Sequence, residues 1–179
     1  MRSSAGVSFL AAMAAAILLL GADAASAQQN TGGCTIEQIG GTSRHLLRCS
    51  NGLSATAEAG ASYVVLDRNR DRSADAVRLN GGALLLEYNP VGQSETPIEV
   101  VAPQAIAAVR GTKWAVDAQA SRTSVFVIDG SVAVRRSSGA NEVVLGAGEG
   151  VDVEAGTGPL EVKRWPAARV SALLARFGQ

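Results

Sequence analysis

The stretch Ala108–Asp117, AVRGTKWAVD, decides how this chain is expected to fold. From Thr112 onward the residues alternate as in a β-strand, with Thr112 and Trp114 on one face. The alternation changes phase at Arg110-Gly111, as it does at a β-bulge, and glycine tolerates the positive φ that bulges often need. We predict a bulge that turns Thr112 and Trp114 into a core. Arg110 would then project near the bend, either as part of a structural corner or as a contact for a ligand or partner.

Residues 1–27 carry the pattern of a secretory signal peptide. Arg2 gives a positive start, an apolar run extends from Ala5 to Leu20, and Ala25-Ser26-Ala27 supplies a small-residue cleavage site. The alternative is an uncleaved membrane anchor, but the run is slightly short for a span. We expect cleavage, a periplasmic location and no membrane span in the remaining chain. That chain is long enough for one domain with a real core.

The charge balance argues against two classes of partner. The chain has 16 Lys and Arg against 16 Asp and Glu, a formal net charge of zero. Nucleic acids and anionic membranes are bound through an excess of positive charge. We therefore predict that the chain binds neither nucleic acid nor an anionic membrane surface.

Two cysteines are placed to close an N-terminal hairpin over residues 28–53. Cys34 and Cys49 flank a turn that contains Gly40-Gly41, and they are equidistant from its centre. A disulfide here would add roughly 3 kcal/mol of stability in an oxidising compartment. A metal pair or a reactive thiol is the alternative, although two sulfurs and one histidine make a poor zinc site.

Residues 54–160 read as short strands separated by turns, which is typical of an all-β domain. The pattern predicts separate strands over 76–79 and 83–88, with Asn80-Gly81-Gly82 between them. Two valines lie on each side of Asp129-Gly130 at matching distances. Either a tight hairpin or a sharp corner between two sheets would keep these four valines on one face.

Residues 161–179 end in an amphipathic helix. Val170, Leu173, Leu174 and Phe177 follow the i, i+3, i+4, i+7 spacing, Pro166 precedes them and Gly178 follows. We expect the helix to cap an open end of the β core, with Trp165 as a wedge. Docking of a partner by the helix is the alternative.

An ordered set of segments resembles the FecR domain. The family pattern V-x-G-T-x-aromatic-x-V is followed by leu-x-G-x-V-x-V and then by an L-x-x-G-E turn, and all three occur here. The segments are 77–86, 98–103, 109–114, 127–134 and 144–149, and the motif residues are Arg110, Gly111, Thr112, Trp114, Gly130, Gly148 and Glu149.

The resemblance implies a role in envelope signalling or assembly. The best-known members of the family relay an outer-membrane signal to a cytoplasmic sigma factor, through a cytoplasmic segment, a membrane span and a further periplasmic module. With a cleavable signal peptide, this chain is expected to be a free-standing exported FecR-domain protein that binds or adapts another envelope component.

The corner pattern also resembles cupin-type double-stranded β-helices. It supports an antiparallel β-sandwich or a jelly-roll-like double-stranded β-helix. The metal chemistry of cupins needs several histidines, and this chain has only His45. The sequence contains no G-x-S-x-G, phosphate-binding glycine loop or H-E-x-x-H. We predict a protein without catalytic activity. One alternative is a carbohydrate- or wall-binding sandwich with an exposed aromatic platform. The other is a cupin-like enzyme.

One loop resembles a calcium site, and calcium is the one cofactor that the sequence suggests. Asp67, Asn69, Asp71 and Asp75 occupy positions 1, 3, 5 and 9 of a calcium-loop pattern. The loop departs from that pattern at two positions, because Arg72 stands at the usual glycine and Arg78 at the usual bidentate glutamate. A turn held by internal salt bridges is the alternative.

Overall fold

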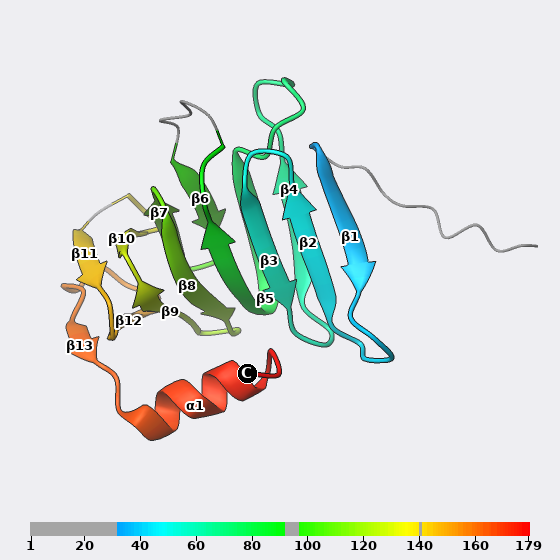
Figure 1. Cartoon of the computed structure of the whole chain (residues 1–179). Coiled ribbons are helices and arrows are strands. Elements are labelled where there is room, and N and C mark those ends of the chain that lie inside the picture. The colour runs from blue at the N-terminus through cyan, green and yellow to red at the C-terminus, as the bar shows by residue number, and fades with distance from the viewer. Residues whose placement is uncertain (1–31, 92–96, 140) are drawn as a thin grey trace, which may run out of the picture.

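The structure is a computed structural model that describes residues 32–91, 97–139 and 141–179. The expected signal peptide lies outside these residues. The described chain is mostly β, with one short helix near its C-terminus (Figure 1). The strands are β1 (Cys34–Gln38), β2 (His45–Cys49), β3 (Leu53–Ala57), β4 (Ser62–Leu66), β5 (Ala76–Tyr88), β6 (Ile98–Val101), β7 (Ala105–Val109), β8 (Thr112–Ala118), β9 (Arg122–Asp129), β10 (Ser131–Arg136), β11 (Glu142–Gly146), β12 (Glu149–Glu154) and β13 (Val162–Arg164), and the helix is α1 (Ala167–Ala175).

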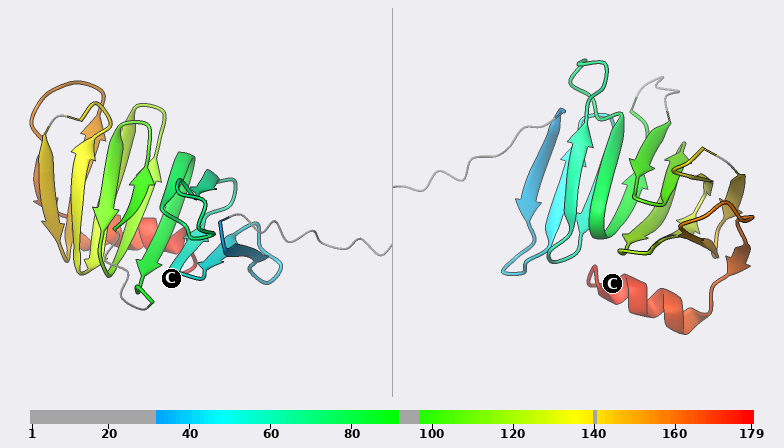
Figure 2. Two further views of the ribbon diagram at one scale, coloured as in Figure 1. Left: turned by 90° about the horizontal axis from the view of Figure 1, so that it is seen from above. Right: turned by 180° about the vertical axis from the view of Figure 1, so that it is seen from behind.

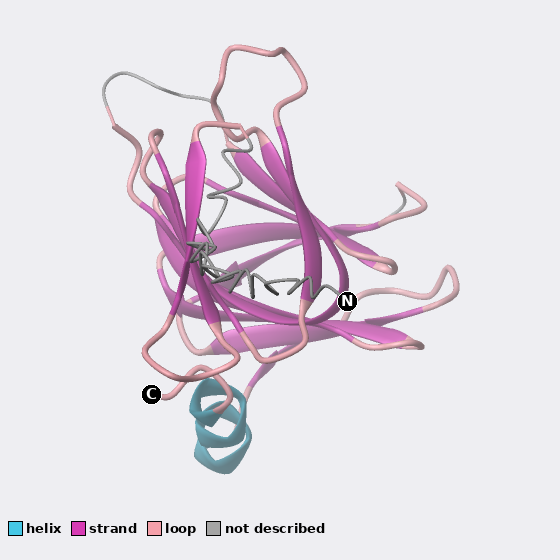
Figure 3. Cartoon of the chain, turned by 90° about the vertical axis from the view of Figure 1, so that its right-hand side faces the viewer, coloured by secondary structure: helices cyan, strands magenta, loops and turns pink. Residues whose placement is uncertain are grey.

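The strands form one nearly closed, barrel-like sheet whose two halves share β5 (Figure 3). Sheet A has the order β1-β2-β3-β5-β8-β9-β12-β13, and sheet B has the order β4-β5-β6-β7-β10-β11. Strand β5 is a single strand of 13 residues, not the two strands that the sequence predicted. It passes from sheet B into sheet A near Gly82, which has a φ of +82°.

The sheet is mixed, so the expected all-antiparallel pairing is wrong at one place. Strands β5 and β6 pair in parallel over Ala76–Arg78 and Glu99–Val101. Strand β5 bends back at Gly82. Its first and last residues therefore both lie on the side of the barrel that is opposite to the bend. The chain therefore re-enters sheet B from the side on which β5 began, and β6 runs in the same direction as the start of β5.

The Arg110-Gly111 step is a corner between the two halves of the barrel. Strand β7 belongs to sheet B and β8 to sheet A, and Gly111 between them has a φ of +72°. The predicted β-bulge at this step is wrong, because a bulge lies within one strand pair, whereas here the chain changes its pairing partners. A register shift does occur further on, between Lys113 and Trp114 in the pairing of β8 with β9.

The same crossing occurs twice more, at Gly130 between β9 and β10 and at Gly148 between β11 and β12. These glycines have φ values of +84° and +82°. Hydrogen bonds tie the three corners together: the Thr112 hydroxyl donates to the Ser131 carbonyl at 2.9 Å, and the Gly148 N–H donates to the Val127 carbonyl at 2.9 Å. The corners therefore form one connected end of the barrel.

The valines on both sides of Gly130 all enter the core, as the sharp-corner alternative predicted. Strand β9 pairs with β8 and β12, whereas β10 pairs with β7 and β11, so the two strands are not a hairpin. Val125, Val127, Val132 and Val134 are fully buried in the same cluster. One glycine at the corner thus keeps the alternation in phase on both strands.

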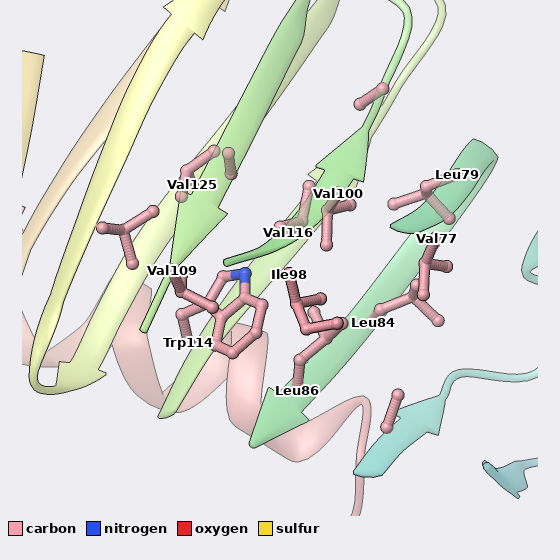
Figure 4. Packing of buried hydrophobic residues seen from close by; sticks show 14 of the residues in the cluster. Val77, Leu79, Leu84, Leu86, Ile98, Val100, Val109, Trp114, Val116 and Val125 are labelled. Carbon is pink, nitrogen blue, oxygen red and sulfur yellow. The ribbon is translucent and has the colours of Figure 1, made fainter. Parts of the chain in front are cut away.

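The core lies between the inner faces of the two sheets (Figure 4). Trp114, which is 0% exposed, is its largest side chain and lies near Val109, Ile98 and Leu86. The inward orientation of Trp114 and Thr112 was predicted correctly.

The N-terminal hairpin and its disulfide are also as predicted. Cys34 pairs with Cys49 across β1 and β2, and their sulfurs are bonded. Because β2 also pairs with β3, the hairpin is the start of sheet A, and Leu47 on β2 is buried in the main core.

Helix α1 crosses the strands of sheet A on the outside of the barrel (Figures 1 and 2). The expectation that it caps an open end of the core is wrong. On sheet A, outward-facing apolar residues alternate with the core-facing ones and give the helix a separate apolar surface. This second cluster consists of Ala83, Leu85, Ala115, Phe126, Trp165, Leu173 and Phe177.

We expect Gly130→Ala to destabilise the fold more than Gly139→Ala. The two glycines have similar φ values, +84° and +87°, so both substitutions incur the left-handed penalty of about 1–2 kcal/mol. An added Cβ at Gly130 would also lie 2.9 Å from the Gly111 carbonyl oxygen and 2.9 Å from the Thr112 hydroxyl, whereas nothing lies within 4 Å at Gly139. Urea unfolding of both variants measures the difference, and equal losses would contradict the tight stacking of the corners.

Candidate functional site

Most of the predicted motif residues build the connected corners. Gly111, Gly130 and Gly148 supply the left-handed backbone. The Glu149 carboxylate accepts a hydrogen bond from the Gly146 N–H at 2.8 Å and so closes the turn from β11 to β12. These residues shape the barrel end and leave no reactive group pointing outward.

Trp114 acts through its apolar ring. Its indole Nε1 is buried and has no hydrogen-bond partner in the part of the chain that the structure describes. An unpartnered buried donor costs about 1–3 kcal/mol, so the stabilising contribution of this side chain comes from the area that the ring buries. Trp165 is also mostly buried, at 8% exposure, so neither tryptophan forms the exposed platform that carbohydrate binding would need.

Arg110 is the one motif residue that points into solvent. No hydrogen bond or ion pair of its side chain is formed within the described ranges, and it lines a shallow groove of about 350 Å³. The groove lies on the outer face of sheet B, and its other lining residues are Pro97, Ala108, Val109, Ser131, Ala133 and Val144. Arg110 therefore lies at the corner and is accessible from solvent.

The outer face of sheet B carries exposed apolar side chains at both edge strands. Val64 on β4 is 47% exposed and Val144 on β11 is 65% exposed. The strand register places Val144, Ala133 and Ala108 in one row across β11, β10 and β7. The face therefore combines a short apolar row with charged residues, since Glu99 continues this row on β6 and Arg135 and Glu142 are paired in the next one.

The outer face of sheet A, in contrast, is covered by α1. The Trp165 ring stacks on Phe126 with 5.0 Å between centroids, and the Arg169 guanidinium lies over the indole, 3.4 Å from its centroid. Gly150 leaves the space that the ring occupies, because an added Cβ there would overlap it. The sequence indicated Trp165 as a wedge but did not identify this stack.

Two arginines fasten the helix to acids of sheet A and to Glu58, which follows β3. Arg169 donates to both carboxylate oxygens of Asp152, which also accepts from the Ser124 hydroxyl at 2.6 Å. Arg176 forms a fork to Glu58, at 2.6 and 2.7 Å, and reaches Asp117 at 2.8 Å. Bidentate arginine–carboxylate pairs fix geometry as well as adding energy, so they set the position of α1 on the sheet.

These ion pairs shift two pKa values. Partial burial acts to raise the pKa of Asp152, but the hydrogen bonds from Arg169 and Ser124 and the charges of Arg169 and Arg122 outweigh it and hold that pKa below its ordinary value. The hydrogen bonds to Glu58 and Asp117 raise the pKa of Arg176. Both groups are therefore charged at neutral pH.

A polar hollow of about 380 Å³ lies beside Trp165, under the segment that leads to β13. Arg136 contributes to its wall, but its guanidinium is already used: it donates to the carbonyls of Glu154 at 2.6 Å and of Gly158 at 2.8 Å. This arginine therefore holds the 155–160 segment in place.

In the Asp67–Asp75 loop, the predicted calcium ligands point into the turn. The Asp67 carboxylate accepts from the backbone N–H groups of Asp71 and Arg72, at 3.2 and 3.0 Å. The Asp75 carboxylate accepts from the N–H of Arg68 at 2.6 Å. Loop carboxylates thus satisfy backbone donors, which the salt-bridge alternative did not foresee.

The calcium prediction stays untested by this arrangement. Within the described ranges, no group of three or more His, Cys, Asp and Glu side chains lies close enough together to hold a metal ion. Arg70 and Arg72 both adopt positive φ, at +63° and +68°. These are positions 4 and 6 of the loop, so the tight backbone turn forms although neither residue is glycine.

The chain belongs to the FecR protein family, whose match covers residues 39–133. That range holds the corners at Gly111 and Gly130, the buried Trp114 and the exposed Arg110. A search of curated proteins found no match.

Two crystal structures share the fold. Both are of a candidate anti-sigma factor from Parabacteroides distasonis, at 2.50 and 1.65 Å resolution. They match with TM-scores of 0.58 and 0.57 at 21% identity and cover 79% and 78% of this chain. The chain spans only 64% of the length of each of them. In the described residues, α1 is neither long nor apolar enough to cross a membrane.

We expect millimolar calcium to raise the melting temperature more than the same concentration of magnesium. Calcium accepts six to eight oxygen ligands in irregular geometry, which suits a loop rich in carboxylates. Thermal unfolding of the chain measures the shift. The double variant Asp67→Asn/Asp71→Asn should lose the response, since it keeps acceptors for the backbone but removes two charges. Equal melting temperatures in the two ions would contradict calcium binding.

Asp152→Asn should lower the melting temperature at pH 7, with a difference that shrinks on acidification. The folded-state pKa of Asp152 is depressed, so its stabilising contribution is complete above its unfolded value of about 3.9 and is lost as the pH falls through the lower folded value. Glu161→Gln is the matched control, because this carboxylate pairs with Lys163 and both side chains are largely exposed. A difference that is independent of pH would show that Asp152 does not act through its charge.

Proposed function

We propose that the chain is an exported FecR-domain protein without catalytic activity, which acts as a binding or adaptor module for another protein of the cell envelope, in signalling or assembly. The outer face of sheet B is the observation that carries this proposal. It combines exposed valines, a groove and the unpaired Arg110 in the described part of the chain.

Two further observations support the proposal. The Cys34–Cys49 disulfide agrees with an oxidising, extracytoplasmic compartment such as the periplasm. The fold is shared with a candidate anti-sigma factor, which supports a role in signal transduction for this FecR domain. The jelly-roll-like description is part of the proposal as well, since three corner crossings join the two halves of the barrel.

Recovery of a partner from envelope extracts tests the proposal. The tagged full chain, treated in cells with a short cross-linker, should enrich one or a few envelope proteins, and tagging the recovered partner should enrich the chain in return. Trp114→Asp, which places a charge in the core, serves as the control for capture by unfolded protein.

Other results would overturn it. Retention of the chain on cell-wall glycan without a protein partner would favour the carbohydrate-binding alternative. Turnover of a small molecule by the purified chain would favour an enzyme. The absence of any reciprocally enriched protein would remove the adaptor role.

A further inference from the structure

The docking of α1 shows what this barrel needs in order to hold a helix. On sheet A, outward-facing Leu85, Ala115 and Phe126 form a row across three neighbouring strands. The helix lies across the strands, above this row. Acids of the sheet then bind the arginines of the helix on one side of the apolar contact.

The outer face of sheet B also carries an apolar row, which Glu99 continues on β6. Val144, Ala133 and Ala108 form one row, and Ile106 and Val101 are paired neighbours in the next. Strands are spaced about 4.8 Å apart, close to the 5.4 Å pitch of an α-helix, so a helix lying across strands offers about one apolar side chain to each strand. No described segment of the chain covers this face as α1 covers sheet A.

The charges on sheet B are the reverse of those on sheet A. Arg78 and Arg110 are exposed, and neither has an ion-pair partner within the described ranges. The acids of this face are Glu99, which is already paired with Arg68 at 2.8 Å and with Arg135 at 3.5 Å, and Glu142, which lies opposite Arg135 in the strand register. The face therefore has an excess of positive charge, although the whole chain is neutral.

We propose that the outer face of sheet B binds an amphipathic helix of the partner protein, with acidic residues bordering its apolar stripe. The proposal rests on the proposed function and specifies the partner. The helix packs its stripe along Ala108, Ala133 and Val144, and its acids pair with Arg78 and Arg110. To cross five strands it needs about 20 Å of length, or about 14 residues.

A second copy of the chain does not fit this site. Its own amphipathic helix, α1, contains no acidic residue and carries Arg169, with Arg176 at its end. These charges would repel Arg78 and Arg110. The charge pattern therefore favours a partner helix that carries acidic residues, in contrast to the arginines of α1.

Site-specific photo-cross-linking tests this assignment in the cells that make the protein. A photo-reactive residue in place of Val144, on sheet B, is compared with one in place of Val162, which is 37% exposed on β13 of sheet A. Val144 should yield a cross-linked partner peptide that has apolar residues at i, i+3, i+4 and i+7 and acidic residues beside them. Val162 should not.

Charge reversal gives the second readout. Arg78→Glu together with Arg110→Glu should reduce cross-linking at Val144 at least tenfold, whereas Arg48→Glu, an exposed arginine on sheet A, should leave it unchanged. The melting temperature of each variant is measured as well, to check that the fold is retained. An unchanged yield in the double variant would overturn the assignment.

The remaining outcomes separate this inference from the proposed function. A cross-linked peptide from this chain itself, a lipid, or a partner peptide without the acidic helical pattern overturns the inference. If a partner is recovered from extracts but Val144 gives no cross-link, the adaptor role stands and this site for it is wrong. If neither experiment finds a partner, the adaptor role fails as well.

Discussion

The fold depends on the left-handed glycines at the corners where the chain passes between the two sheets. Three such corners lie together, and an added side chain at Gly130 would approach the backbone of the neighbouring corner to within 2.9 Å. At each corner the alternation of side chains has to stay in phase, since a slip of one residue would turn the core valines outward. The glycines of the family pattern, Gly111 and Gly130, are therefore the residues that allow the core to close.

Closing the core in this way produces two outer faces that the chain uses differently. Sheet A is held under its own C-terminal helix by the Trp165–Phe126 stack and by arginine–carboxylate forks. Those contacts occupy Asp117 and Asp152 of sheet A and Glu58 after β3. Sheet B leaves Arg78, Arg110 and two valines exposed, and Arg110 belongs to the family motif.

Local patterns in the sequence predicted the features that depend on neighbouring residues. Cysteine spacing gave the correct disulfide register, and strand alternation gave the inward turn of Trp114. Features that depend on distant residues were missed. The pairing of Arg176 with Glu58 joins residues 118 positions apart, and the parallel pairing of β5 with β6 depends on how far β5 folds back. The bulge was mispredicted for the same reason, because a phase change looks alike whether the strand keeps its partner or exchanges it.

Because the chain is neutral as a whole, its composition did not predict that one face carries unpaired arginines. A formal net charge of zero argues against a general electrostatic attraction to polyanions, and this conclusion holds for the chain as a whole. It does not describe a single face. The arginines of the helix pair with Asp152, Asp117 and Glu58, whereas Arg78 and Arg110 at sheet B form no ion pair within the described ranges. Because apolar residues lie between those arginines, a phosphate backbone would leave the apolar rows exposed, whereas an amphipathic protein segment can cover the rows and pair with the charges together.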